Sequence, residues 1–113
     1  MCSENKLNEA LKIFVDEIKV LFKEDLRGVI LFGSYARGNY DAESDIDIMV
    51  LVDIEKAEIK KYRGAVLEIV TKLDWDYDII LSPIVQNNNE FEIYKNASGF
   101  FKNVSNEGVR LSA

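Results

Sequence analysis

Residues 29–52, VILFGSYARGNYDAESDIDIMVLV, decide the fold of this chain. The stretch opens on four apolar residues, which have the length of a strand and stop at Gly33. Its last eight residues, 45–52, alternate aspartate with isoleucine and then become apolar throughout, which predicts a second strand with both aspartates on one face. The polar segment between the two strands allows a turn or two of helix and then a loop.

Hydrophobic periodicity predicts the remaining elements. Apolar residues recur at spacings of three and four over 7–22, 59–73 and 91–104, which predicts three amphipathic helices. A third strand is expected over 77–84, and Gly108 is a stop signal for the last helix. The expected fold class is therefore α+β, a small mixed sheet of three to four strands flanked by helices.

The connections between the strands set their directions. The short link between the first two strands favours antiparallel pairing, whereas the helix between the second and third strands favours parallel pairing. Three polar pairs that are distant in sequence are then expected at one edge of the sheet: Gly33 and Ser34, Asp45 and Asp47, and Asp76 and Asp78.

The composition is that of a globular protein, and it excludes several kinds of catalysis. The 113 residues, expected to form a single domain over 1–113, are 48% hydrophobic and 30% charged. Histidine is absent, which excludes Ser-His-Asp catalysis and His-ligated zinc. The net charge of −6 argues against direct DNA binding. Because Cys2 is the only cysteine and no apolar run has membrane-spanning length, we expect a cytoplasmic protein with no membrane association.

Two carboxylates in an otherwise apolar strand suit a divalent cation. Asp45 and Asp47 repel each other unless they face water or are neutralised, and oxygen-only ligands favour Mg2+ or Mn2+ over zinc. Gly33 permits a tight turn off the first strand, and Ser34 begins a short helical segment whose free N–H groups can hold a phosphate. Acids on an exposed strand face explain the aspartate pair alone equally well, and a serine helix cap is the more common explanation of Gly33 and Ser34 alone. Only the combination is therefore informative.

The combination resembles a known family. Residues 33–50, GSYARGNYDAESDIDIMV, closely resemble the signature of the nucleotidyltransferase superfamily that includes DNA polymerase beta. The resemblance covers approximately residues 5–110, and the closing Glu107-Gly108-Val109 is similar to that of the minimal nucleotidyltransferases (MNT) of bacteria and archaea. It implies a nucleotidyltransferase fold.

The resemblance also implies a role for each candidate residue. Asp45 and Asp47 would hold two Mg2+ ions, with Mn2+ as the alternative metal, and Asp78 would complete the site of the metal that faces the acceptor. Asp76 is the alternative to Asp78, because both are expected on the same strand face.

The nucleotide-binding residues implied by the resemblance are Gly33 and Ser34, which would grip the terminal phosphates of ATP or another nucleoside triphosphate. Arg37 would either add a phosphate contact or be a solvated loop arginine.

The implied reaction is transfer of a nucleoside monophosphate, AMP from ATP, to a hydroxyl group. The resemblance points to a HEPN-type toxin partner, whose tyrosine would be the acceptor, so that the chain would act as the antitoxin. One alternative is adenylylation of a small molecule such as an aminoglycoside, with a homodimer supplying the acceptor pocket. Another is a non-catalytic antitoxin that only masks its partner.

Overall fold

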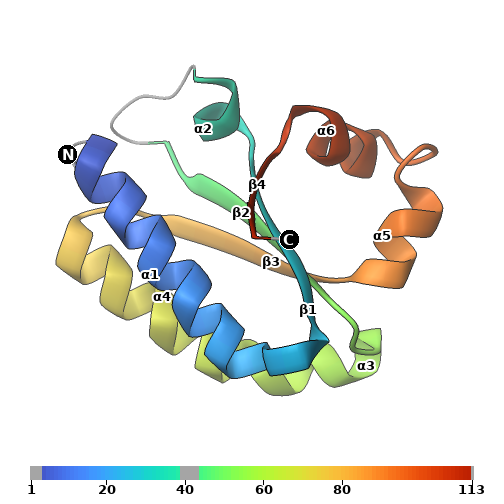
Figure 1. Ribbon diagram of the computed structural model, residues 1–113, viewed down its shortest axis with the longest axis horizontal. Coiled ribbons are helices and arrows are strands. Elements are labelled where there is room, and N and C mark those ends of the chain that lie inside the picture. The colour runs from blue at the N-terminus through green and yellow to red at the C-terminus, as the bar shows by residue number, and fades with distance from the viewer. Residues whose placement is uncertain (1–3, 39–43, 113) are drawn as a thin grey trace.

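The computed structural model describes residues 4–38 and 44–112 as a four-stranded mixed sheet with helices on both faces (Figure 1). The strand order is β3-β2-β1-β4. Within these ranges every helix is too short or too polar to serve as a membrane span. The helices are α1 (Glu4–Phe22), α2 (Ser34–Arg37), α3 (Lys56–Ile59), α4 (Arg63–Tyr77), α5 (Asn88–Tyr94) and α6 (Gly99–Glu107), with 3-10 turns at Lys23–Asp25 and Lys60–Tyr62. The strands are β1 (Leu26–Phe32), β2 (Ile46–Val52), β3 (Leu81–Asn87) and β4 (Val109–Ser112).

The strand directions agree with those expected from the lengths of the connections. β1 and β2 are antiparallel and place Phe32 opposite Asp47, whereas β2 and β3 are parallel and place Asp47 beside Ser82. β4 pairs antiparallel with β1. The predicted mixed α+β sheet is confirmed, and it has the fourth strand that the prediction allowed.

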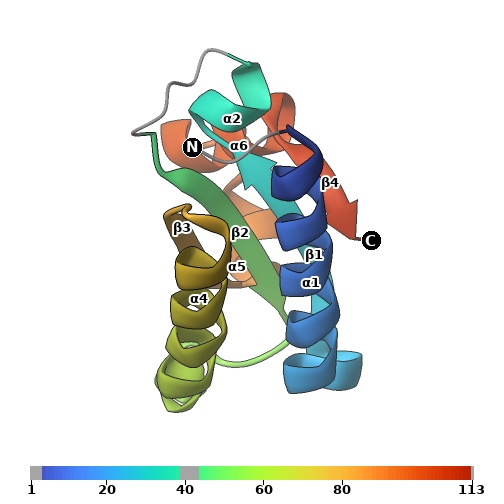
Figure 2. The same ribbon diagram turned by 90° about the vertical axis from the view of Figure 1, so that its left-hand side faces the viewer.

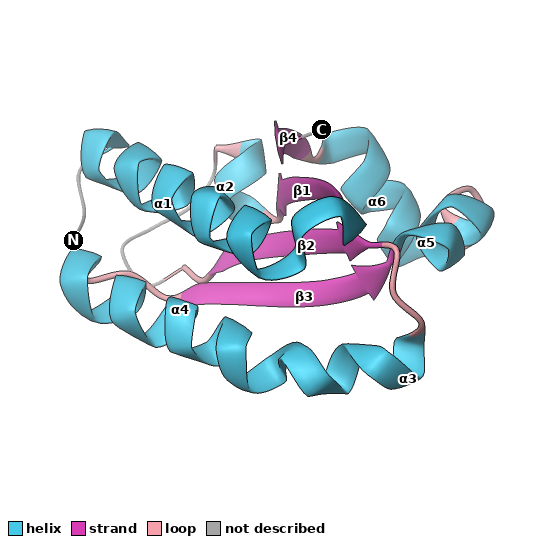
Figure 3. Ribbon diagram, turned by 60° about the horizontal axis from the view of Figure 1, so that its bottom comes forward, coloured by secondary structure: helices cyan, strands magenta, loops and turns pink. Residues whose placement is uncertain are grey.

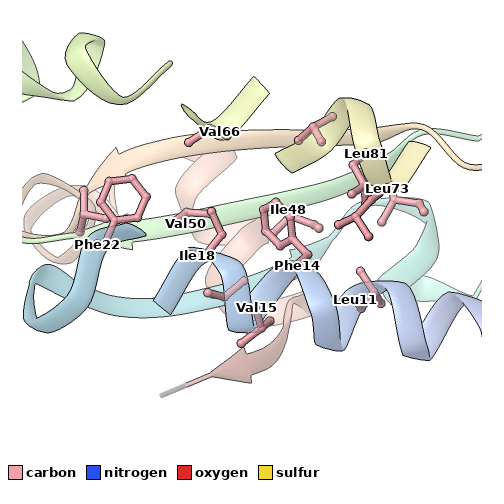
Figure 4. Close-up of a cluster of buried hydrophobic side chains, with 14 of the residues drawn as sticks. Leu11, Phe14, Val15, Ile18, Phe22, Ile48, Val50, Val66, Leu73 and Leu81 are labelled. Carbon is pink, nitrogen blue, oxygen red and sulfur yellow. The ribbon is translucent and has the colours of Figure 1, made fainter. Parts of the chain in front are cut away.

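The core lies on both faces of the sheet, and β2 contributes side chains to each. Successive β2 residues point to opposite faces, and every β2 residue except Asp47 is buried. Helices α1 and α4 cover one face, where Phe14, Ile18 and Ile48 belong to a single apolar cluster (Figures 3 and 4). On the other face, α5 and α6 contribute Phe91 and Val104 to a second cluster. Asp47 lies on this second face, half-buried.

The boundary between α4 and β3 differs from the prediction. The third strand was expected over 77–84, but α4 continues to Tyr77 and β3 begins at Leu81. Asp76 is therefore helical, and Asp78 ends the helix in a left-handed conformation, with φ 54° and ψ 52°. The alternating acids of Asp-Trp-Asp-Tyr-Asp imitate a strand, but Leu73 and Tyr77 keep the helical spacing and pack against the core under α1.

The predicted last helix is two helices. Asn87 begins α5 by accepting a hydrogen bond from the Glu90 N–H at 2.8 Å, and the Ser98 hydroxyl caps α6 in the same way at 3.4 Å. The residues between 84 and 91, for which no element was predicted, therefore include the start of a helix, at Asn88. The stop signal at Gly108 is confirmed, because α6 ends there and β4 follows.

Candidate active site

The turn from β1 into α2 strongly favours glycine. Gly33 has φ 74° and ψ −155°, a backbone conformation that residues with a Cβ rarely adopt. A Cβ atom added to Gly33 would also overlap the carboxylate of Asp47 on the neighbouring strand. The glycine therefore makes a sharp turn and leaves the space that the Asp47 carboxylate occupies.

Helix α2 starts directly after this turn. It consists of Ser34–Arg37, and the Arg37 N–H donates a hydrogen bond to the Gly33 carbonyl at 3.2 Å. The first N–H groups of a helix have no partner within the helix. In α2 these groups follow directly after Gly33, so they lie at the same end of the sheet as Asp47. Gly38 then ends α2 with φ 80°.

The charge of Asp45 acts on the carboxyl of Asp47. Asp45 immediately precedes β2 and is exposed, whereas Asp47 is half-buried. Burial raises the pKa of the Asp47 carboxyl, the charge of Asp45 raises it further, and the Arg37 guanidinium lowers it. The expectation that both acids lie at the edge of the sheet beside Gly33 and Ser34 agrees with this geometry.

Arg37 interacts with carboxylates on two sides. Its guanidinium forms an ion pair with Glu107 at 3.5 Å, and it also attracts Asp47. Glu107 is the last residue of α6, so the ion pair connects the helix after β1 to the helix before β4 (Figure 2). In the sequence, Glu107 is recognisable only as part of the closing Glu107-Gly108-Val109, which predicts no contact for it.

The third acidic position is where the structure departs most from expectation. Asp76 and Asp78 do not lie on a strand face beside Asp45, because the strand begins at Leu81. Asp76 lines the groove between α1 and α4. Within residues 4–38 and 44–112, no group of three acidic, histidine or cysteine side chains is close enough together to hold a metal ion.

Asp74, in the last turn of α4, interacts with the start of β3 and with Asp45. Its carboxylate accepts a hydrogen bond from the Leu81 N–H at 2.9 Å, at the start of β3. Burial raises the pKa of Asp74, the Leu81 hydrogen bond lowers it, and the charge of Asp45 raises it. A helix predicted over 70–77 would have placed Asp74 beside the sheet. The alternating acids favoured a strand there instead, although Leu73 and Tyr77 have helical spacing.

The donor set fits a divalent cation in type. Asp45 and Asp47 supply carboxylate oxygens, which are the ligands that Mg2+ and Mn2+ prefer. Their mutual repulsion and the burial of Asp47 both disfavour the two negative charges, and a bound cation would offset that cost.

One edge of this sheet brings the start of α2 next to the Asp47 carboxylate, an arrangement that suits the transfer of a nucleotide. The family comparison agrees with this arrangement and defines the class of protein as a nucleotidyltransferase. The chain belongs to the nucleotidyltransferase domain family, which matches residues 11–107.

Curated relatives carry a more specific name. A protein of Methanocaldococcus jannaschii named "Putative protein adenylyltransferase MJ0141" is 38% identical over 105 residues, covering 91% of this chain and 96% of the relative. A second M. jannaschii protein with the same description, MJ0604, is 37% identical over 100 residues, covering 88% of this chain and 92% of the relative.

Solved structures share the fold. A toxin–antitoxin crystal structure with AMP-PNP is 26% identical with a TM-score of 0.54, covering 96% of this chain and 72% of that chain. A structure of a mutant MntA–HpeT toxin–antitoxin is 26% identical with a TM-score of 0.53, covering 98% and 72%. A complex of a tri-AMPylated HEPN toxin of Shewanella oneidensis with an MNT antitoxin is 23% identical with a TM-score of 0.51, covering 96% and 70%, and shows the fold alone.

Proposed function

We propose that this protein transfers AMP from ATP to a tyrosine hydroxyl of a HEPN-type toxin and thereby acts as its antitoxin. The observation that carries the proposal is the Gly33 turn, which brings the start of α2 against the Asp47 carboxylate. The names of the curated relatives support a protein acceptor, and the similar toxin–antitoxin structure with AMP-PNP supports ATP as the donor. The proposal assigns the reaction to the cytoplasm, where ATP is abundant, and to a single domain over residues 1–113.

In the proposed reaction, Gly33 and Ser34 bind the terminal phosphates through the start of α2, and the Arg37 guanidinium adds a contact to them. The acceptor oxygen forms a bond to the α-phosphorus while the bond from that phosphorus to pyrophosphate breaks. Asp45 and Asp47 would hold two Mg2+ ions. When bound, these ions would lower the pKa of the attacking hydroxyl and offset the charge of the triphosphate.

Asp78 is proposed as the third carboxylate. It lies between the end of α4 and Ile80, and the Ile80 carbonyl accepts a hydrogen bond from the Ile46 N–H at 2.8 Å. That bond connects the segment after Asp78 to the residue that follows Asp45. Asp78→Asn is therefore expected to lower transfer strongly, whereas the matched variant Asp76→Asn, on the groove beside α1, leaves transfer unchanged. The opposite order would assign the role to Asp76.

The test of the function uses ATP labelled at either end. The purified protein is incubated with Mg2+ and the HEPN-type protein encoded beside it, and label is expected on that protein from α-labelled but not from γ-labelled ATP. Asp47→Asn should abolish the transfer. Asp53→Asn is the matched control, because Asp53 is an exposed acid at the other end of β2 that pairs with Arg27 at 3.0 Å.

Three other results would contradict the proposal. Inhibition of the partner without labelling would show a masking antitoxin instead. Labelling of an aminoglycoside but not of the protein would show a small-molecule enzyme. Labelling that persists when each tyrosine of the partner is replaced by phenylalanine would show a different acceptor group.

A further inference from the structure

An exposed aromatic ring lies on the same face of the sheet as Asp47. Phe100, the second residue of α6, is 46% exposed, although it is among the largest apolar side chains of the protein. Its ring centroid is 5.6 Å from that of Phe32, with the planes at 79°. Phe32 is directly opposite Asp47 in the β1–β2 pairing, where side chains on one face have Cβ atoms about 4.5–5.5 Å apart. Phe32 is therefore a neighbour of both the Phe100 ring and Asp47.

The side of α6 that carries Phe100 also faces α2. Phe100 and Glu107 are seven residues apart and so lie on the same side of the helix. Glu107 pairs with Arg37 of α2, and Figures 1 and 2 both place α2 and α6 at the same end of the sheet. Phe100 contacts Phe32 and Glu107 contacts Arg37, so this side of α6 contacts the candidate site near both ends of the helix.

The exposed part of Phe100 is not needed by the core on that face. Phe101, the next residue, packs its ring against Phe91 with centroids 5.4 Å apart, and Val104 is fully buried one turn later. These two residues attach α6 to the sheet. Part of the Phe100 ring packs against Phe32 and Phe101, and its remaining exposed surface is an aromatic group beside a polar site, which is a typical lining of a ligand-binding site.

We propose that the Phe100 ring is the contact for the nucleobase of the bound nucleoside triphosphate. The inference rests on the proposed function: with the terminal phosphates on Gly33 and Ser34 and the α-phosphate at Asp47, the nucleoside lies over the sheet face beside Phe32. An aromatic ring there stacks on the base. Stacking tolerates any base because every base has a π-face, so the contact strengthens nucleotide binding without selecting adenine over guanine.

The experiment compares a nucleotide with its phosphates alone. Binding of AMP-PNP, of GTP and of inorganic tripolyphosphate is measured by calorimetry in Mg2+ for the wild type, Phe100→Leu, Phe100→Ala and Phe100→Trp. Loss of the ring in the leucine and alanine variants should weaken AMP-PNP binding about tenfold or more, leave tripolyphosphate binding unchanged and weaken GTP binding equally. Phe100→Trp should retain AMP-PNP affinity. Tyr94→Ala on α5, an aromatic residue of similar exposure at 53%, is the matched control and should bind like the wild type.

Each contrary result has a distinct meaning. Equal losses for AMP-PNP and tripolyphosphate would show that Phe100 only supports the fold, and unchanged AMP-PNP affinity would remove the nucleobase contact altogether. Unchanged AMP-PNP affinity with reduced transfer to the partner would assign the ring to the acceptor instead. If the wild-type protein bound neither AMP-PNP nor tripolyphosphate, the proposed function itself would be wrong. Loss of AMP-PNP binding in the Phe100 variants alone would leave that function intact.

Discussion

Replacing Gly33 with alanine tests the central feature of the site. The φ of 74° and ψ of −155° at Gly33 lie in a region that is essentially reserved for glycine, which costs about 1–3 kcal/mol for other residues. The added Cβ would also overlap the Asp47 carboxylate and force that side chain out of its rotamer, for about 0.5–1.5 kcal/mol. The expected loss of unfolding free energy is therefore roughly 1.5–4.5 kcal/mol, a fall in Tm of roughly 6–18 °C for a domain of this size.

Gly38→Ala is the matched control for Gly33→Ala. Gly38 also has a positive φ, 80°, but a Cβ there would meet no atom of the described residues, 4–38 and 44–112, within 4 Å. It should lose about 1–2 kcal/mol from backbone strain and keep its activity. Gly33→Ala should in addition lose roughly 100-fold or more in transfer, because a displacement of about 1 Å at a reacting group has that effect.

The measurements are thermal unfolding by circular dichroism and single-turnover transfer of label from α-labelled ATP, both well below the Tm of the weaker variant. Equal losses of stability in the two variants, with equal activity, would refute the argument that Gly33 makes room for Asp47. A stability loss without an activity loss in Gly33→Ala would separate the turn from the chemistry.

Three further predictions concern charge, capping and the core. In metal-free buffer at neutral pH, Asp47→Asn should raise the Tm, because burial and the neighbouring carboxylate raise the folded-state pKa of this acid. Between pH 3.8 and the raised pKa, the folded state retains a proton that the unfolded state has lost. The advantage of the variant in Tm should therefore shrink as the pH falls through the raised pKa towards 3.8. A constant advantage in a pH series of melting curves would contradict this prediction. Asn87→Ala should cost about 1–2 kcal/mol in urea unfolding, whereas Asn87→Asp keeps the cap of α5 and loses only the amide donor to the Ile54 carbonyl at 2.7 Å. Phe14→Ala, at a fully buried position, should cost about 3–5 kcal/mol, against less than about 0.5 kcal/mol for Trp75→Ala, whose side chain is 87% exposed; comparable losses in urea unfolding would disprove the core assignment.

Local sequence determined the strands that carry the site. The apolar run before Gly33 and the alternation from Asp45 onward are statements about a few consecutive residues, and the structure forms β1 and β2 there. The strand directions followed as well, because a short link and a helical link impose different geometries on the strands they join. The family signature over 33–50 belongs to this locally determined part.

Tertiary contacts decided what the local pattern left ambiguous. Whether Asp-Trp-Asp-Tyr-Asp forms a strand or the end of a helix depends on Tyr77 packing against a core that α1 and the sheet build, and no short window contains that core. The Arg37–Glu107 ion pair joins residues 70 positions apart, and the charge of Asp45 acts on Asp74 because α4 returns to the start of β3. Periodicity describes which side of an element is apolar, whereas the partners of a charged side chain are set by how separate elements come together in space.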